Sequence, residues 1–217
     1  MPRVKQRTPE LRGRVLEVAL DMLSSEGVAG FTTRRIAQEA ETSPPAVYEL
    51  FGDKAGLVRE VFFEGFRMLR RRLEELEQSD DARADVIHVI EVVRAFVRDN
   101  PVLADVMFSR PFADFDPGPG ELRAGSAVRE LIVATVTRCT DAGVLDGNQA
   151  DISHALLALA QGLASQETAG WLGTSKVSMD RRWALAVSAM LNGLSPGEPA
   201  ARSRPSRSSP PVARVRR

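Results

Sequence analysis

The chain has 217 residues, of which 43% are hydrophobic and 27% are charged, close to the averages for soluble globular proteins. This composition excludes wholesale disorder, collagen-like structure and coiled-coil rods, and a chain of this length buries about 70% of its unfolded surface. The 29 basic and 29 acidic residues give a formal net charge of zero.

Cysteine, histidine and apolar content limit the possible sites and compartments. Cys139, His88 and His154 are too few for an internal disulfide or a four-ligand zinc site. The basic start of the chain is not followed by an apolar segment, and no run of 18 apolar residues occurs. We therefore expect a cytoplasmic protein without a signal peptide or a membrane span.

The charge is unevenly distributed along the chain. Residues 198–217 contain six arginines and one glutamate, so this segment carries +5 and the rest carries −5. The same segment is rich in proline and serine, which predicts a disordered tail over 196–217. An acidic body with local basic patches can still bind DNA, because affinity follows the charges that face the phosphates.

The apolar periodicity is helical almost everywhere and predicts an all-α fold. Thr8-Pro9-Glu10 marks the start of the first helix, and Gly27 suits its left-handed cap. Further helices are predicted at 33–40, 44–51, 54–77, 83–99, 101–112, 121–142, 149–171 and 179–194. Three prolines and two glycines predict a loop over 111–120.

The two short helices follow a bracing helix and are separated by Glu41-Thr42-Ser43. This layout is typical of a helix-turn-helix protein, whose second helix enters the DNA major groove. We therefore expect a DNA-binding domain over 1–53 and a helical ligand-binding and dimerisation domain over 54–195.

Residue identities in this region indicate a family. The run Phe31-Thr32-Thr33-Arg34-Arg35-Ile36-Ala37-Gln38-Glu39-Ala40, with Ser43, Val47-Tyr48, Phe51, Lys54 and Leu57, closely resembles the N-terminal module of the TetR family of transcriptional regulators. Three features depart from that family's pattern: Glu41 replaces a glycine of the turn, Leu50 replaces a common histidine, and Pro44-Pro45 carry no side-chain donor.

The C-terminal half more faintly resembles the family's subgroup with a WHG-type domain. The resemblance lies in Asp99-Asn100-Pro101, Met107-Phe108 and Gln161-Gly162-Leu163, whereas Leu157 and Gln161 stand where the subgroup has Trp and His.

Candidate DNA contacts follow from helix physics and from the resemblance. Thr32 is expected to cap the second helix, which leaves Thr33 and the exposed N–H groups of that helix end to hold a phosphate. The resemblance implies that Arg34 reaches a base edge and that Tyr48 and Lys54 contact phosphates. The predicted DNA-contacting residues are Thr33, Arg34, Ser43, Pro44, Pro45, Ala46, Tyr48 and Lys54.

Each of these candidates has a plainer interpretation. Arg34 and Arg35 could be a solvated pair, and Tyr48 could be a core aromatic, as we expect for Phe51. Ser43 is expected to cap the third helix, with Pro44, Pro45 and Ala46 on the outer face of that helix.

Large aromatic or flexible side chains on several body helices predict a pocket for a small, lipophilic, largely uncharged effector. The predicted ligand-binding residues are Phe62, Phe66, Met68, Phe96, Met107, Phe108, Gln161 and Trp171. Candidate polar anchors are Arg94, Gln161, Gln166 and Glu167. A solid core built from the same residues is the alternative.

The last two helices are apolar on more than one face, which predicts a homodimer. The residues behind this prediction are Ile152, Ala155, Leu156, Leu159, Leu163, Trp183, Leu185, Val187, Ala189, Met190 and Leu191.

These features together predict a ligand-responsive regulator, a repressor that binds a palindromic operator in double-stranded DNA as a dimer. One alternative is a helical interaction protein or coregulator that has lost sequence-specific DNA binding, and a second is a small-molecule-binding helical enzyme. The sequence has no Gly-rich phosphate loop, nucleophile elbow or HExxH motif. We therefore expect no catalysis, no metal and no cofactor.

Overall fold

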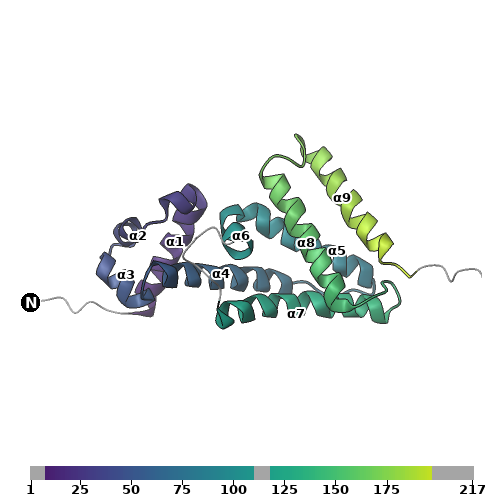
Figure 1. Cartoon of the computed structure of the whole chain (residues 1–217), viewed down its shortest axis with the longest axis horizontal. Helices are drawn as coiled ribbons and strands as arrows, with labels where there is room; N and C mark the ends of the chain where they lie inside the picture. Colours follow the sequence, from purple (N-terminus) through teal and green to yellow (C-terminus); the bar gives the residue numbers. More distant parts are fainter. Residues whose placement is uncertain (1–7, 110–117, 197–217) are drawn as a thin grey trace, which may run out of the picture.

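The computed structural model describes residues 8–109 and 118–196. Within these two ranges the chain forms nine α-helices and no strand, so the all-α prediction is confirmed (Figure 1). The helices are α1 (Pro9–Gly30), α2 (Thr33–Glu39), α3 (Pro44–Phe51), α4 (Lys54–Glu74), α5 (Ala82–Asp99), α6 (Pro101–Phe108), α7 (Pro119–Asp141), α8 (Gln149–Thr168) and α9 (Lys176–Gly193).

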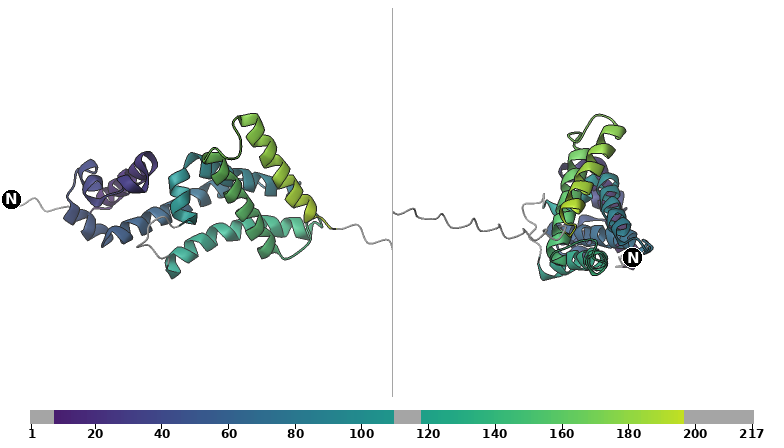
Figure 2. Two further views of the ribbon diagram at one scale, coloured as in Figure 1. Left: turned by 45° about the horizontal axis from the view of Figure 1, so that its top comes forward. Right: turned by 90° about the vertical axis from the view of Figure 1, so that its right-hand side faces the viewer.

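The helices form a small unit, α1 to α3, at one end of an elongated molecule and a larger body at the other. Helix α4 begins in the small unit and runs into the body, where it packs against α6 and α7. Helix α5 packs against α7 and α8, and α9 packs on α8 at the outside of the body (Figure 2). Helix α1 also packs against α6, so the small unit touches the body at two places.

Capping residues set most helix starts. The Thr8 hydroxyl accepts a hydrogen bond from the Leu11 N–H at 3.3 Å, with Pro9 in the first helical position. The Asp53 carboxylate accepts one from the Gly56 N–H at 2.7 Å. On α9, Ser175 and Ser178 cap each other's backbone. Because of this capping box, α9 starts at Lys176, three residues before the predicted start at 179.

Helix ends differ more from the prediction. Gly27 has the expected positive φ of +71°, but the helical path resumes after this kink and reaches Gly30. Helix α4 ends at Glu74, three residues before the predicted end. Helix α8 ends at Thr168 because Gly170 takes a left-handed φ of +77°, and the Trp171 N–H then bonds back to the Gln166 carbonyl at 2.8 Å.

The predicted loop over 111–120 is partly described. Pro119 and Gly120 belong to α7, because a proline fits the first helical position where no N–H is needed. Residues 111–117 lie outside the described residues, as does the predicted tail from residue 197 onward.

One continuous core joins the small unit to the body, and α4 contributes the most to that continuity. Its buried positions recur at helical spacing along one side of the helix. These positions are Gly56, Leu57, Val58, Val61, Phe62, Gly65, Phe66, Leu69 and Leu73. Since α4 is buried from its first turn to its last, the body can influence the small unit through this helix.

Candidate nucleic-acid interface and effector-binding body

Helices α2 and α3 are held by an apolar cluster that they share with α1. Phe31, Ile36, Ala37 and Val47 are each 1% exposed or less. Thr32 takes an extended backbone, and its hydroxyl accepts a hydrogen bond from the Arg35 N–H at 3.4 Å, which confirms the predicted cap of α2.

The turn between α2 and α3 passes through Glu41, which has a φ of +52°. Among the described residues other than glycine, Glu41 alone has a positive φ. The turn is closed by the Thr42 N–H, which donates to the Ala37 carbonyl at 2.8 Å. Glu41, which replaces the glycine of the family's pattern, therefore occupies the left-handed position of the turn, where glycine is the least strained residue.

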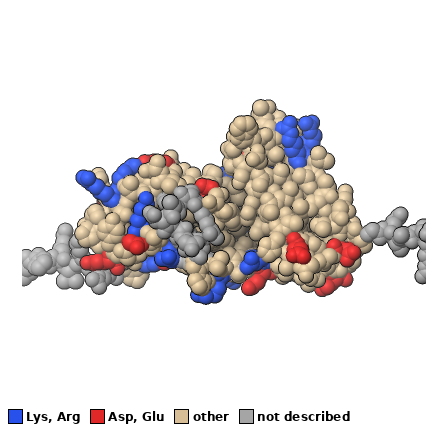
Figure 3. Space-filling model, viewed as in Figure 1, with Lys and Arg blue, Asp and Glu red and all other residues tan. Residues whose placement is uncertain are grey.

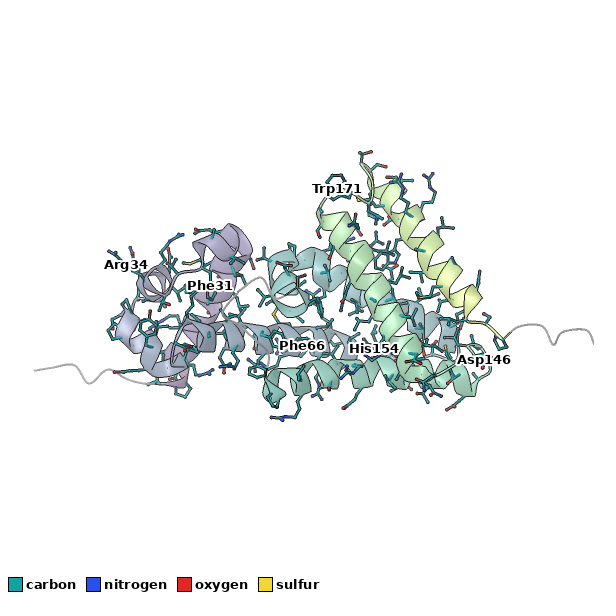
Figure 4. The ribbon with its side chains drawn as sticks, viewed as in Figure 1. Phe31, Arg34, Phe66, Asp146, His154 and Trp171 are labelled. Atoms are coloured by element: carbon teal, nitrogen blue, oxygen red, sulfur yellow. The ribbon has the colours of Figure 1, made fainter. Side chains whose placement is uncertain are left out.

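Arg34 and Arg35 differ in their surroundings. Arg35 is paired with Glu26 of α1, and its Nη2 donates to Glu26 Oε1 at 2.6 Å. This hydrogen bond lowers the pKa of Glu26 and raises the pKa of Arg35. Arg34 is exposed, has no ion-pair partner within the described residues, and projects from the outer side of α2 (Figure 4). Arg34 is thus the arginine of this pair that is available to DNA.

The start of α2 offers a phosphate its backbone more than the Thr33 side chain. Thr33 is buried, with 8% of the residue exposed, so little of its side chain is accessible to a phosphate. The N–H groups of Thr33 and Arg34 have no hydrogen-bond partner within the described part of the chain, as is usual for the first turn of a helix. An anion at this end would be held by these N–H groups.

The surface of α3 differs from the predicted one. Ala46 is 4% exposed and therefore buried, which contradicts its predicted place on the outer face. The helix has only eight residues and packs against both α2 and α4, so two of its faces are covered. Tyr48 is 47% exposed, in agreement with a surface role, whereas Phe51 is buried as expected.

Ser43 occupies the N-cap position of α3 but makes no side-chain capping hydrogen bond. Pro44 and Pro45 have no N–H to be capped, and the Ala46 N–H donates to the Ser43 carbonyl at 2.9 Å. The prediction that the Ser43 hydroxyl caps α3 is therefore wrong.

The junction of α3 and α4 is tight. A side chain at Gly56 would overlap the carbonyl oxygen of Phe51, so glycine is required for the last turn of α3 to lie against the first turn of α4. Lys54 stands exposed at the start of α4, beside this junction. The position of Lys54 relative to α3 is thus fixed by backbone contact.

Positive and negative side chains both occur over the end of the molecule formed by α1 to α3 (Figure 3). Some of the basic side chains there form ion pairs and others do not. Arg12 of α1 pairs with Glu60 of α4 at 2.8 Å. The pairs between Arg12 and Glu60 and between Arg35 and Glu26 leave Arg34 as the unpaired cation on α2 within the described residues.

In the body, four of the predicted ligand-binding residues come together. The ring centroids of Phe62 and Phe66 are 4.9 Å apart, and those of Phe66 and Phe108 are 6.0 Å apart. Met107 packs against Gly65, which lies between Phe62 and Phe66 in the sequence. Figure 4 shows Phe66 between α4 and α7. We call Phe62, Phe66, Met107 and Phe108 the aromatic cluster.

The other four predicted ligand-binding residues lie elsewhere. Phe96 is fully buried beneath the guanidinium of Arg72, 5.5 Å from its ring centroid. Trp171 is 80% exposed in the loop after α8, so its predicted place in a pocket is wrong. Gln161 is half-buried on α8, and Met68 lines a separate cleft against α1.

Two of the candidate anchors bind each other. The Arg94 guanidinium donates to Glu167 at 2.7 Å and to Asp180 at 2.7 Å, and it lies 4.6 Å from the ring centroid of Trp183. The side chains of Arg94 and Glu167 are 7% and 6% exposed. Burial opposes the charge of Arg94, but the two carboxylates keep its pKa raised. These residues join α5, α8 and α9.

Three cavities lie between the described helices. A void of about 10 Å³ among α5, α7 and α8 has room for one water molecule. A cleft of about 230 Å³ separates the end of α4 from α5 and α7. A cleft of about 350 Å³ lies between α1, α4 and the start of α6. None of the three is lined by the aromatic cluster.

The residues behind the dimer prediction divide into two sets. Ile152, Leu156, Trp183, Val187 and Leu191 are buried inside the subunit, which contradicts a direct role for them in an interface. Leu185 is 69% exposed, Ala155 and Ala189 are exposed, and Leu159, Leu163 and Met190 are partly exposed. The outer surfaces of α8 and α9 thus carry apolar side chains that the subunit does not cover.

Two further observations concern other classes of site. No group of three His, Cys, Asp or Glu side chains with the arrangement of a metal site occurs within residues 8–109 and 118–196. None of the helices in these ranges is long and apolar enough to cross a membrane.

Helices α2 and α3, braced by α1 and carrying Arg34 and Tyr48 on their surface, are joined by α4 to a helical body. This arrangement is that of a helix-turn-helix regulator. Residues 15–61 match the family model described as bacterial regulatory proteins, tetR family. Residues 86–190 match the model described as tetracyclin repressor-like, C-terminal domain. The chain belongs to the TetR family of transcriptional regulators. Its assignment to the WHG-type subgroup stays a prediction.

Curated relatives include the nucleoid occlusion factor SlmA of Haemophilus influenzae, which is 30% identical over 109 residues. This match covers 49% of the chain and 50% of the relative. SlmA of Aliivibrio fischeri is 31% identical over 106 residues, which cover 46% of the chain and 53% of that protein. The chain thus spans about half the length of the curated relatives that it matches.

Solved structures resemble nearly the whole described fold. A protein of unknown function from Rhodococcus sp. RHA1 is 26% identical, with a TM-score of 0.74 over 89% of this chain and 100% of that one. A regulatory protein of the tetR family from Rhodococcus RHA1 is 18% identical, with a TM-score of 0.66 over 88% of this chain and 100% of that one. The second likeness shows the fold alone.

Proposed function

We propose that the chain is a repressor that binds a palindromic operator as a homodimer and releases it when a small lipophilic effector binds the body. Its place of action is the cytoplasm of a bacterium, which holds the chromosome. The observation that carries the DNA-binding part is the contrast between the two arginines of α2. Arg35 forms an ion pair with Glu26, whereas Arg34 is exposed without an ion-pair partner among the described residues.

Each group on this surface has a defined role in the proposal. Arg34 reads a base edge, because its guanidinium fork matches guanine O6 and N7. Tyr48, Lys54 and the N–H groups at the start of α2 contact phosphates and set the register on the duplex. Pro44, Pro45 and the buried Ala46 offer no side-chain donors, so DNA shape and apolar contacts with thymine methyl groups supply the remaining specificity.

The exposed apolar surfaces of α8 and α9 support the dimer. Ala155 and Gly162 are exposed on α8 and allow close helix approach, and Leu185 is exposed on α9. A two-fold contact of these helices would bring two copies of α3 to successive major grooves, about 34–36 Å apart. The aromatic cluster supports an apolar effector, because three rings and a methionine from α4 and α6 gather in the body.

The scarcity of donors on α3 favours a second candidate, a coregulator of the same fold without sequence-specific DNA binding. The full chain should be titrated against the DNA upstream of its own gene and against scrambled DNA, with fluorescence anisotropy at several salt concentrations. The repressor predicts saturable binding that is stronger for the upstream DNA, whereas the coregulator predicts equal, weak binding to both.

Point variants test the individual roles. Arg34→Ala should cost about 1–3 kcal/mol on the operator and relax base preference at one position. Tyr48→Phe and Lys54→Ala should weaken binding to all sequences alike, and Lys54→Ala should reduce the salt slope by about one. Arg123→Ala, at an exposed site on α7, is the matched control and should change neither quantity. An unchanged salt slope for Lys54→Ala would refute the phosphate contact.

A further inference from the structure

The cleft between α1, α4 and the start of α6, which we call the α1–α4 cleft, has a volume of about 350 Å³. This volume lies at the small end of the range of ligand-binding pockets. The lining residues are Gly13, Leu16, Glu17, Leu20, Asp21, Ser24, Glu64, Met68, Asn100 and Leu103. The α1 residues of the cleft follow helical spacing and are distinct from Val15, Ala19 and Leu23, which pack into the core.

The walls of the cleft are apolar on three helices. Leu16 and Leu20 from α1 are half-buried, Met68 from α4 is half-buried, and Leu103 from α6 is buried. A methionine adapts its shape to irregular ligands. The cleft therefore accepts an apolar group of a small molecule between the DNA-binding unit and the body.

The charge of the cleft is negative. Glu17 and Asp21 are exposed and lie four residues apart on α1, so the two like charges repel each other across one helical turn. Neither has an ion-pair partner within the described residues. Glu64, the third carboxylate, is paired with Arg67 at 2.7 Å and with Arg71 at 3.0 Å. Two uncompensated negative charges thus stand beside an apolar wall.

We propose that the α1–α4 cleft binds an amphiphilic organic cation, whose charged head lies between Glu17 and Asp21 and whose apolar part packs on Leu16, Leu20, Met68 and Leu103. A cation between the two carboxylates attracts both of them and neutralises one of the two uncompensated negative charges. The site is separate from the aromatic cluster and from the predicted uncharged effector.

Occupancy of the cleft also regulates DNA binding, and this part rests on the proposed function. Helix α1 belongs to the DNA-binding unit, whereas α4 and α6 belong to the body. A molecule that contacts α1 and α4 together favours one setting of the unit relative to the body, and this setting competes with the one that DNA requires. The bound cation therefore lowers the affinity for DNA, and DNA lowers the affinity for the cation by the same factor.

The probe is octyltrimethylammonium, used far below its micelle concentration and titrated into the full chain by isothermal calorimetry. Octyl sulfate and octanol carry the same chain with a negative or no charge. We expect one cation per subunit, weaker binding of octanol and no binding of octyl sulfate. Equal binding of the three compounds would show that charge does not select the ligand, and would overturn the proposal.

Two variants locate the site. Glu17→Gln combined with Asp21→Asn keeps the shape of the side chains, and should weaken the cation about tenfold while octanol is unaffected. The matched control is Glu130→Gln with Asp141→Asn, which removes two exposed acids of α7 and should leave the affinity unchanged. Gly13→Leu, on a helical surface where an added Cβ meets no atom within 4 Å, should block both ligands while the chain stays folded.

DNA is added last, so that the two proposals fail in different ways. An unchanged cation affinity in the double acid variant overturns the cleft, whatever the chain does with DNA. Where the wild-type chain binds both ligands, we expect operator DNA to weaken the cation at least about fivefold. Equal cation affinity with and without DNA overturns the regulatory part alone, and failure to bind DNA overturns the proposed function alone.

Discussion

Glu41 determines how the chain turns from α2 into α3, and it does so with a backbone conformation that glycine would adopt more easily. Its φ of +52° lies in the left-handed region, which costs a residue with a Cβ about 1–2 kcal/mol. The side chain is exposed. The turn is therefore formed against a local preference and is held by the packing of α2 and α3 on α1.

Glu41→Gly should raise the free energy of unfolding by about 0.5–1 kcal/mol, because the strain is removed while glycine loses more backbone entropy on folding. Urea unfolding followed by circular dichroism measures this change. The control is Glu39→Gly, at an exposed position with ordinary helical backbone, which should lower stability by about 0.5–1 kcal/mol. A loss of stability in Glu41→Gly would contradict the assignment of strain.

Asp85, at the start of α5, is a buried carboxylate of the body that is held by hydrogen bonds. It accepts hydrogen bonds from the Ser79 hydroxyl at 2.7 Å and from Arg138 of α7 at 2.5 Å. The Ser79 hydroxyl foremost, and Arg138 with it, hold the pKa of Asp85 below its ordinary value. The pairing joins α7 to the segment between α4 and α5.

A lowered pKa in the folded state makes stability depend on pH in a defined direction. The ionised Asp85 stabilises the fold above its unfolded-state pKa of about 4, and this contribution is lost as the pH falls through the lower folded-state pKa. Asp85→Asn should therefore lower the melting temperature at pH 7, and the difference from the wild type should shrink below about pH 4. Asp80→Asn, exposed in the same segment, should behave as the wild type. A difference that stays constant from pH 7 to pH 3 would refute this role.

Individual side chains mark the limit of what the sequence predicts. The helical pattern of α3 places Val47 and Phe51 inward correctly, but it cannot reveal that α2 and α4 cover two faces of so short a helix and bury Ala46 as well. Arg94 and Glu167 are 73 residues apart on different helices, and no local pattern pairs them. The α1–α4 cleft was missed for the same reason, although Leu16 and Leu20 form a second apolar row on α1 that could have indicated it.

At the scale of helices, the sequence predicts most of the fold, because caps and apolar spacing act within a few residues. The predicted and observed limits of α3 agree, and α5 differs by one residue at its start. The errors fall where a glycine or a serine changes the backbone locally, as at Gly170 and Ser175. Local chemistry therefore sets the helices, whereas the packing between them requires the structure.

The buried ion pair of Arg94 and Glu167 joins α5 to α8, and Arg94 also binds Asp180 of α9. Arg94→Met would leave the Glu167 carboxylate buried without its main cation, and should lower the free energy of unfolding by about 3 kcal/mol. Arg94→Met combined with Glu167→Met should recover most of that loss, because an apolar pair can replace a buried ion pair. Chemical denaturation measures both variants.

Arg98 provides the matched control for this experiment. It lies 3.7 Å from the same Glu167 carboxylate but is 46% exposed, so Arg98→Met should cost less than about 1 kcal/mol. If Arg94→Met and Arg98→Met were equally stable, the buried pair would have no special role in holding α5 to α8.

For the whole molecule, the proposed recognition of a palindromic operator depends on the proposed dimer. Leu185 is 69% exposed on α9, and Leu185→Lys would place a charge in the proposed interface. We expect a monomer by light scattering at micromolar concentration and at least a tenfold weaker affinity for the palindromic operator. Leu122→Lys, at a 59% exposed site on α7, should leave both the dimer and the affinity unchanged. A dimeric Leu185→Lys protein would place the interface elsewhere.

Helix α4 can convert a small tilt in the body into a larger displacement of the small unit. Its 21 residues form a rod of about 30 Å, one end of which is locked to α3 through the contact between Gly56 and Phe51. If the body tilts this rod by about 10°, simple geometry moves the far end by about 5 Å. Opposite tilts in two subunits would add up to about 10 Å, nearly a third of the 34–36 Å between successive major grooves. In the proposed repressor, a rearrangement of a few side chains in the body would thereby be amplified into a mismatch with the pitch of DNA.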